Sequence, residues 1–184
     1  MRLSSPRIPP LPDSEWKGDA LELLERMQQG GRVLNIFRTL AHHPKLMKRW
    51  LVFGNHVLAK SSLDVREREL VILRVGWLCR AEYEWGQHVI IARGCGLSDD
   101  EIRRIQQGPD APGWDPFEQT LLRAADELHA DSMVSNATWK ELAERYDTQQ
   151  LIDLVFTVGQ YTLVSMALNS FGVQLDEGTE GFSQ

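Results

Sequence analysis

The stretch from Asp64 to Gly96, DVRERELVILRVGWLCRAEYEWGQHVIIARGCG, decides the fold. It opens on a charged turn in which Asp64 and Glu67 have the spacing of a helix capping box. From Leu70 to Cys79 the chain is apolar except for Arg74. A helix that is hydrophobic on nearly all sides belongs at the centre of a bundle. The stretch therefore predicts an all-α protein packed around this segment.

Apolar residues at helical spacing continue on both sides of this stretch. Further helices are expected over residues 16–29, 44–58, 98–105, 116–128, 137–146 and 148–171, with a turn at 35–41. Glycines at 30 and 31 end the first of these, and Thr148 is expected to cap the last. Ser98 with Glu101, and Asp115 with Glu118, predict two capped helix starts. The pattern favours a bundle of roughly eight helices, and it leaves open whether residues 64–96 form one bent helix or two.

Three segments are expected along the chain. Residues 1–15 hold four of the eight prolines and form an extended arm, which packs on the surface or reaches a neighbouring subunit. Residues 16–173 form a single all-α domain, because 184 residues suffice for one core. Residues 174–184 form an acidic, flexible tail.

Composition and charge narrow the class of protein. A net charge of −6 argues against a nucleic-acid partner. The apolar segment 151–173 includes Asp153 and several uncharged polar residues, which favours a core helix over a membrane span. The N-terminus lacks the apolar region of a secretory signal. Cys79 and Cys95 fit no zinc motif or disulfide framework, so we expect two thiols in a reducing cytoplasm.

Glu84 and His88 form the first chemical candidate. They stand four residues apart on a helix, within reach of each other. A carboxylate there would fix the tautomer of the imidazole and raise its pKa, which suits an acid or a base. If the chain breaks near Ala81, the helix dipole would favour the ionised form of Glu84. The simpler interpretation is a surface pair worth a few tenths of a kcal/mol.

The wider pattern resembles the carboxymuconolactone decarboxylase family, within the alkylhydroperoxidase D-like superfamily. The resemblance is carried by REREL at 66–70, by YEW-x-x-H at 83–88, and by Gly159-Gln160-Tyr161 with Asn169. It covers residues 45–172. It implies an all-α subunit that assembles into homotrimers or homohexamers through its core helices.

The peroxidase branch of this superfamily carries the motif C-x-x-C-x-x-x-H after an upstream glutamate. Aligned on His88, the upstream glutamate matches Glu69, and the two cysteine positions hold Ala81 and Glu84. A dithiol peroxidase needs an attacking and a resolving thiol, so we do not expect that chemistry here.

The resemblance to the decarboxylase branch implies a lyase that acts on a small carboxylated lactone or a related metabolite. It implies that Glu69, Glu84 and His88 are catalytic, with His88 as the proton donor to an enolate-like species. We expect no cofactor and no metal. The candidate substrate-binding residues are Arg66, Arg74 and Arg80 for the carboxylate, and Tyr83, Trp85 and Tyr161 as an aromatic lining.

Three alternatives stay open. In the first, the chain is a peroxidase-family protein without the dithiol pair, with Cys79 as a lone thiol. In the second, it is a metal protein that uses two carboxylates and a histidine as ligands. In the third, it is a non-catalytic oligomer that binds a small molecule. A buried His88 paired with carboxylates favours catalysis, and an exposed, unpaired His88 favours a scaffold.

Overall fold

The computed structural model describes residues 2–28 and 31–182. In these residues the chain is all-α, with nine α-helices. A single 3₁₀ turn (η1, Asp13–Glu15) precedes them, and a π-helical turn (η2, His56–Lys60) follows the third. The α-helices are α1 (Gly18–Arg26), α2 (Asn35–Leu40), α3 (Pro44–Asn55), α4 (Val65–Leu78), α5 (Glu82–Gly94), α6 (Asp99–Gln107), α7 (Pro116–Asp131), α8 (Asn136–Ala143) and α9 (Thr148–Phe171).

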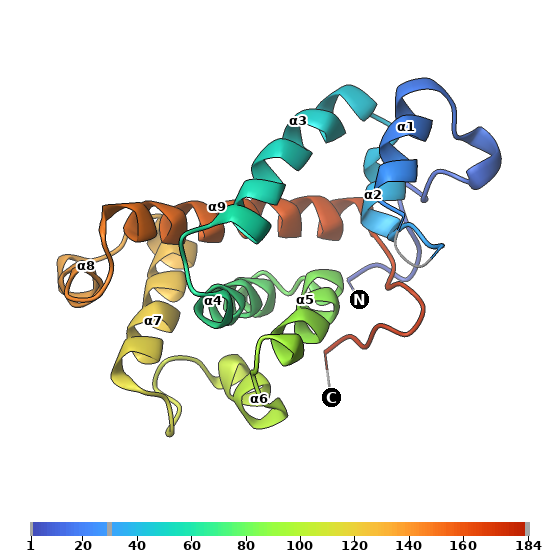
Figure 1. Ribbon diagram of the computed structural model, residues 1–184. Coiled ribbons are helices and arrows are strands. Elements are labelled where there is room, and N and C mark those ends of the chain that lie inside the picture. Colours follow the sequence, from blue (N-terminus) through green and yellow to red (C-terminus); the bar gives the residue numbers. More distant parts are fainter. Residues whose placement is uncertain (1, 29–30, 183–184) are drawn as a thin grey trace.

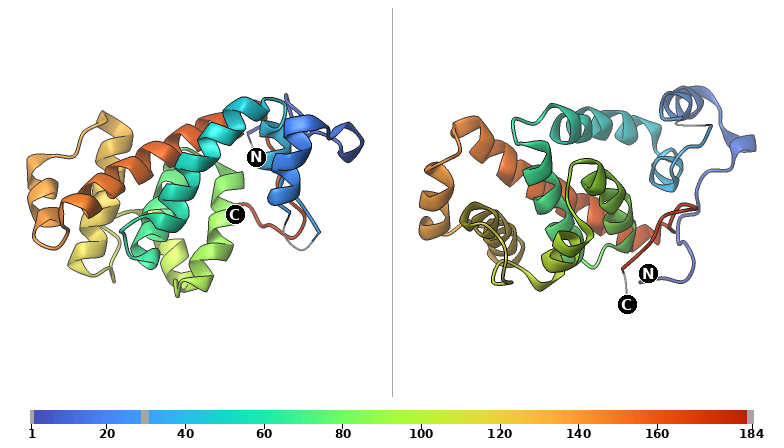
Figure 2. Two further views of the ribbon diagram at one scale, coloured as in Figure 1. Left: turned by 45° about the horizontal axis from the view of Figure 1, so that its top comes forward. Right: turned by 60° about the horizontal axis from the view of Figure 1, so that its bottom comes forward.

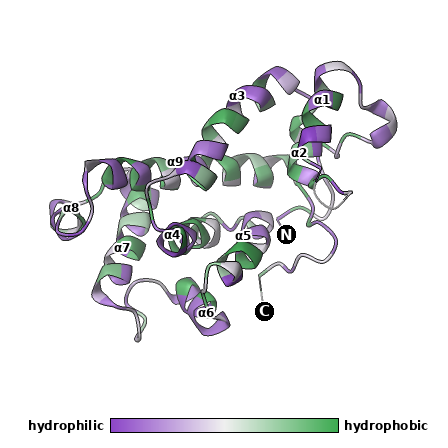
Figure 3. Ribbon diagram, viewed as in Figure 1, coloured by the Kyte–Doolittle hydropathy of each residue, from purple (hydrophilic) through white to green (hydrophobic). Residues whose placement is uncertain are grey.

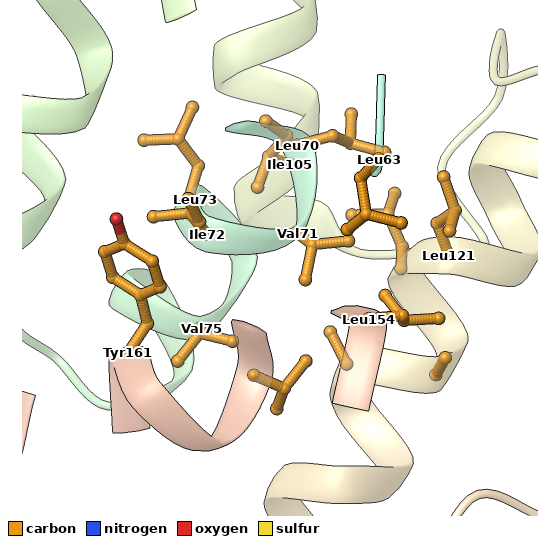
Figure 4. Packing of buried hydrophobic residues seen from close by; sticks show 14 of the residues in the cluster. Leu63, Leu70, Val71, Ile72, Leu73, Val75, Ile105, Leu121, Leu154 and Tyr161 are labelled. Carbon is orange, nitrogen blue, oxygen red and sulfur yellow. The ribbon is translucent and has the colours of Figure 1, made fainter. Parts of the chain in front are cut away.

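Helix α4 lies at the centre of the bundle, as its sequence predicts. It packs against α5, α6, α7 and α9, and its residues 70–73 are almost completely buried. Figure 4 shows these side chains between Leu121 of α7 and Leu154 and Tyr161 of α9. Helix α9 runs along much of the molecule, with α8 near one end and α2 near the other (Figures 1 and 2).

The segment 64–96 forms two helices rather than one bent helix. Arg80 adopts the left-handed conformation with φ 51°, which a non-glycine residue rarely takes inside a helix. The N–H of Ala81 then donates to the carbonyl of Gly76, and α5 begins one residue later. The reversal folds α5 back onto α4, so side chains from both helices face each other.

Two predicted helix starts are confirmed. Ser98 and Glu101 form a capping box at α6, and Asp115 and Glu118 form another at α7. In each box both side chains accept from the backbone N–H of the other residue, which satisfies N–H groups that would otherwise be unpaired at the start of the helix.

Two other expectations about capping are wrong. Asp64 caps α4 through the N–H of Arg66, but the carboxylate of Glu67 accepts from the Tyr146 hydroxyl at 2.7 Å instead of closing a box. A tertiary partner therefore replaces the local one. At α9 the cap is Asp147, and Thr148 is the first helical residue.

The N-terminal part also differs from expectation. The turn expected at residues 35–41 is the short helix α2, and the helix expected over 16–29 is limited to Gly18–Arg26. Gly30 and Gly31 were expected to end that helix; Gln29 and Gly30 lie outside the described residues, and Gly31 has a positive φ of 83°. The N–H groups of Arg7 and Ile8 donate to the carbonyl of Phe171, so the proline-rich arm packs on its own chain.

The described part of the acidic tail has ordered contacts, where a flexible tail was expected. The buried Asp176 accepts hydrogen bonds from the Tyr83 hydroxyl at 2.5 Å and from the backbone of Asn35 at 2.9 Å. The ring of Phe182 packs against Trp77 and Trp85, with centroids 5.0 and 5.6 Å away. Both contacts join residues far apart in the sequence.

By length and composition, α9 is the one helix in the described residues that could cross a membrane, and half of that stretch is buried inside the protein. Figure 3 shows it as a largely hydrophobic helix that passes through the fold. The apolar helix is therefore a half-buried core helix.

A test of the tail contacts follows from Gly86, because a Cβ at this position would collide with the carbonyl of Glu180 and the methyl group of Thr179. We expect Gly86→Ala to displace residues 177–182 and to expose them to limited proteolysis. Gly159→Ala is the matched control, since its Cβ meets nothing within 4 Å. That change should leave the tail protected and stabilise α9 by about 0.5–1 kcal/mol. A tail that stays protected in Gly86→Ala would contradict the packing described.

Candidate active site

Glu69, His88 and Glu84 converge between α4 and α5. His88 Nδ1 lies 2.6 Å from Glu69 Oε2, and His88 Nε2 lies 3.1 Å from Glu84 Oε1. The exposed fractions of the three residues are 0%, 6% and 4% for Glu69, His88 and Glu84. The helical spacing of Glu84 and His88 gives one contact, and the reversal at Arg80 gives the other. The surface-pair interpretation is therefore wrong, because the pair is buried and has a third member.

Arg68 adds a positive charge to this cluster. Its guanidinium donates to Glu69 Oε1 from Nε at 3.2 Å and from Nη2 at 3.1 Å, and Arg68 is itself buried. Glu69 thus binds the cation with one oxygen and the imidazole with the other. A buried carboxylate needs such partners, because an unpaired charge in the interior is strongly destabilising.

The surroundings of His88 favour its protonated form. Desolvation acts to lower the pKa of His88, but hydrogen bonds and charge interactions with Glu69 and Glu84 outweigh it and raise the pKa to about 9. The imidazole is therefore an imidazolium at neutral pH. With Arg68, the cluster holds two positive and two negative charges.

Tyr161 of α9 closes one side of the cluster. Its ring meets that of His88 edge-on, with centroids 4.9 Å apart. Burial, followed by the charges of Glu84 and Glu69, raises the pKa of Tyr161 well above its ordinary value. The phenol therefore stays neutral and lies beside the imidazolium.

The three arginines expected to bind a substrate carboxylate lie in other surroundings. Arg66 is held by the carboxylates of Glu101 and Glu118 at 2.5 and 2.7 Å. Arg74 binds Asp126 at 2.6 and 2.8 Å and the carbonyl of Ile105 at 2.8 Å. Arg66 and Arg74 therefore link α4 to α6 and α7.

The third of these arginines, Arg80, is exposed at the turn between α4 and α5. It borders an open hollow of about 520 Å³ with Trp77 and Glu82. The cation at the cluster itself is Arg68. Arg68 was not among the residues expected at the site, although it lies inside the REREL motif.

The remaining aromatic candidates serve the packing of the tail. The hydroxyl of Tyr83 binds Asp176, and Trp85 packs against Trp77 and Phe182. Of the aromatic residues expected at the site, Tyr161 is the one that contacts His88.

The surroundings of Cys79 and of the possible metal ligands bear on the lone-thiol and metal alternatives. Cys79 Sγ lies 3.7 Å from His129 Nδ1, and burial raises the pKa of this half-buried thiol. Within residues 2–28 and 31–182, no group of three or more His, Cys, Asp or Glu side chains has the geometry to hold a metal ion. Both ring nitrogens of His88 are engaged with carboxylates.

Solved structures define the class of this fold. A peroxidase-related protein from Silicibacter sp. TM1040 superposes with a TM-score of 0.77 at 17% identity, over 96% of this chain and 92% of that one. A peroxidase-related protein with an alkylhydroperoxidase AhpD core, from Ralstonia eutropha JMP134, gives 0.75 at 21% identity, over 91% and 87%. The debrominase Bmp8, bound to 2,3,4-tribromopyrrole, gives 0.77 at 13% identity, over 95% and 94%. The chain therefore has the AhpD-like fold.

The sequence of the central helices matches a known protein family. Residues 44–127 match the carboxymuconolactone decarboxylase family, and they include Glu69, Glu84 and His88. This part of the chain is therefore similar to the carboxymuconolactone decarboxylase family, and the whole chain has the AhpD-like fold. A comparison with proteins of curated function gives no significant match.

The raised pKa of His88 predicts how stability depends on pH. His88 titrates near 6.5 when unfolded and near 9 when folded, so its contribution is complete below pH 6.5 and is lost as the pH rises through 9. The two values imply a loss on the order of 3 kcal/mol. Urea unfolding of the wild type from pH 6 to 10 should show this fall.

Two variants separate His88 from other groups that titrate at alkaline pH. His88→Gln should lack the fall, and His129→Gln, which changes an exposed histidine, should keep it. An equal fall in the wild type and in His88→Gln would show that His88 is not charged in the folded protein.

Proposed function

We propose that the chain is a lyase of the decarboxylase type that acts on a small carboxylated lactone or a related metabolite. The observation that carries the proposal is the buried His88, which both carboxylates of the site hold as an imidazolium. A proton donor is what decarboxylation of such a compound requires, because the reaction passes through an enolate-like species.

The proposed step moves one proton and one electron pair. The bond between the substrate carbon and its carboxylate breaks, carbon dioxide leaves, and the electron pair remains on the substrate as an enolate. His88 then donates its proton to the enolate carbon, and solvent returns a proton to the imidazole. Positive charge held near the developing enolate lowers the barrier, because the cluster is arranged before the reaction.

We propose different roles for the two carboxylates. Glu69 is completely buried and fixed by Arg68, so it orients the Nδ1 side of the ring. Glu84 is slightly exposed and stands in the first turn of α5. We therefore propose Nε2 as the donating nitrogen, with Glu84 as the carboxylate that moves aside or relays the proton.

A peroxidase role is the second candidate, since two similar structures are described as peroxidase-related. It would have to use Cys79, because Ala81 and Glu84 occupy the positions of the redox pair. A raised pKa leaves little thiolate at Cys79, and the thiolate is the reactive form. The lyase proposal is therefore preferred.

The proposal includes self-association through the exposed apolar residues of α9. Ile152, Phe156, Leu163 and Met166 are all at least half exposed and recur at heptad spacing, and Phe156 contacts Phe53 of α3. Such a stripe marks an interaction site. Phe156→Glu should convert a trimer or hexamer into smaller species in sedimentation velocity, whereas Lys140→Glu on α8 should not. A wild-type monomer at micromolar concentration would contradict this part of the proposal.

The catalytic roles can be tested by release of carbon dioxide from a panel of small carboxylated lactones. His88→Gln should lower kcat by about 100-fold or more, because general acid catalysis is worth 10²–10⁴-fold. In the wild type, kcat should fall as the pH rises through 9, where His88 loses its proton. Arg68→Met should change this pH profile, because it removes the partner that fixes Glu69.

Two cysteine variants distinguish the lyase from the peroxidase. Cys79→Ser and Cys95→Ser should leave carbon dioxide release unchanged. Loss of peroxide reduction in Cys79→Ser, together with full activity of His88→Gln on every lactone that is turned over, would overturn the lyase proposal in favour of the peroxidase.

A further inference from the structure

An open hollow of about 520 Å³ lies where the N-terminal arm and the C-terminal tail approach the start of α5 (Figure 1). Its walls come from the arm, from the turn between α4 and α5, and from the tail. The lining residues are Arg2, Trp77, Leu78, Arg80, Glu82 and Phe182. Glu69, Glu84 and His88 do not line it, so the hollow is separate from the proposed catalytic cluster.

Two cations at this hollow are unpaired. The guanidinium groups of Arg66, Arg68 and Arg74 each bind a carboxylate. In residues 2–28 and 31–182, by contrast, the guanidinium groups of Arg2 and Arg80 form no hydrogen bond and no ion pair. Both residues are exposed, and each guanidinium has five N–H donors. These donors are therefore available to an anion in the hollow.

The backbone of Arg80 also indicates a role for its side chain. Arg80 follows the C-cap of α4 and has a left-handed φ of 51°. Glycine usually occupies this position after a helix, because a side chain makes the left-handed conformation unfavourable. Such strain is concentrated at active sites and at residues that hold ligands. The turn therefore holds a cation at the hollow at the expense of backbone strain.

The charges of the lining define the charge of the ligand. Two guanidinium groups and the carboxylate of Glu82 give the hollow one excess positive charge. A single carboxylate would neutralise it, and an arginine binds a carboxylate through two parallel hydrogen bonds. A phosphate monoester carries more than one negative charge at neutral pH and would leave negative charge uncompensated beside Glu82. The lining therefore favours a carboxylate.

The aromatic side chains define the rest of the ligand. Trp77 and Phe182 meet edge-on with ring centroids 5.0 Å apart, and with Leu78 they form the apolar part of the lining. Aromatic side chains bind a planar ring by stacking or by edge contact. Ligand pockets typically measure about 300–1,000 Å³, so the hollow is large enough for an aromatic ring and its carboxylate.

We infer that this hollow is a second binding site, which takes a planar aromatic carboxylate. Arg80 and Arg2 bind the carboxylate, and Trp77 and Phe182 contact the ring. The inference does not depend on the proposed lyase activity, because no residue of the catalytic cluster takes part.

Benzoate and benzamide are suitable probes, because they have the same shape and only benzoate is charged. Ligand-observed NMR titration of the full-length protein should show saturable binding of benzoate, about tenfold tighter than that of benzamide. Phenyl phosphate should bind no more tightly than benzoate. Equal affinity for benzoate and benzamide, or tighter binding of phenyl phosphate, would overturn the inference.

Three variants test the location of the site. Arg80→Gly removes the guanidinium and relieves the backbone strain, so the variant should be at least as stable as the wild type. Its affinity for benzoate should fall about tenfold, to that for benzamide. Phe182→Ala should weaken the binding of both probes. Arg26→Gln, which changes an exposed arginine on α1, should have no effect. Undiminished binding of benzoate to Arg80→Gly, or no binding to the wild type, would contradict the assignment.

Discussion

The contact on which the rest of the site depends is the buried series of charges Arg68, Glu69, His88 and Glu84. Two carboxylates, one imidazolium and one guanidinium neutralise one another within the interface of α4 and α5. Removal of any member leaves an uncompensated charge in a region that water barely reaches, which typically costs about 3–5 kcal/mol. The same charges that stabilise the interface hold a proton on His88 that a reaction can use.

The backbone supports this arrangement at one position. Arg80 takes a left-handed conformation and reverses the chain between two helices, so that Glu69 on α4 faces His88 on α5. Helix α4 can hold the buried Glu69 because Arg68 and His88 neutralise its charge, while the residues that follow it pack in the apolar core. Helix α9 then encloses the cluster with Tyr161.

Much of this could be predicted from the sequence. The apolar run 70–79 placed α4 at the centre, and local signals located the starts of α6 and α7. The Glu84–His88 contact follows from helical spacing, whereas the approach of Glu69 was expected only from the family resemblance. Arg68 was missed because the burial of an arginine depends on the rotation of its helix. The contacts of Asp176 and Phe182 were missed because they join the C-terminal tail to residues far back in the sequence, such as Asn35 and Trp77.

The central claim is that His88 is an imidazolium held between two carboxylates at neutral pH. Nitrogen-15 NMR of the histidine-labelled protein at pH 7 tests it most directly, with His88→Gln used to assign the signal. Both ring nitrogens of His88 should carry protons, and the signal should titrate near pH 9. A neutral ring with one protonated nitrogen at pH 7, titrating near 6.5 or below, would contradict it.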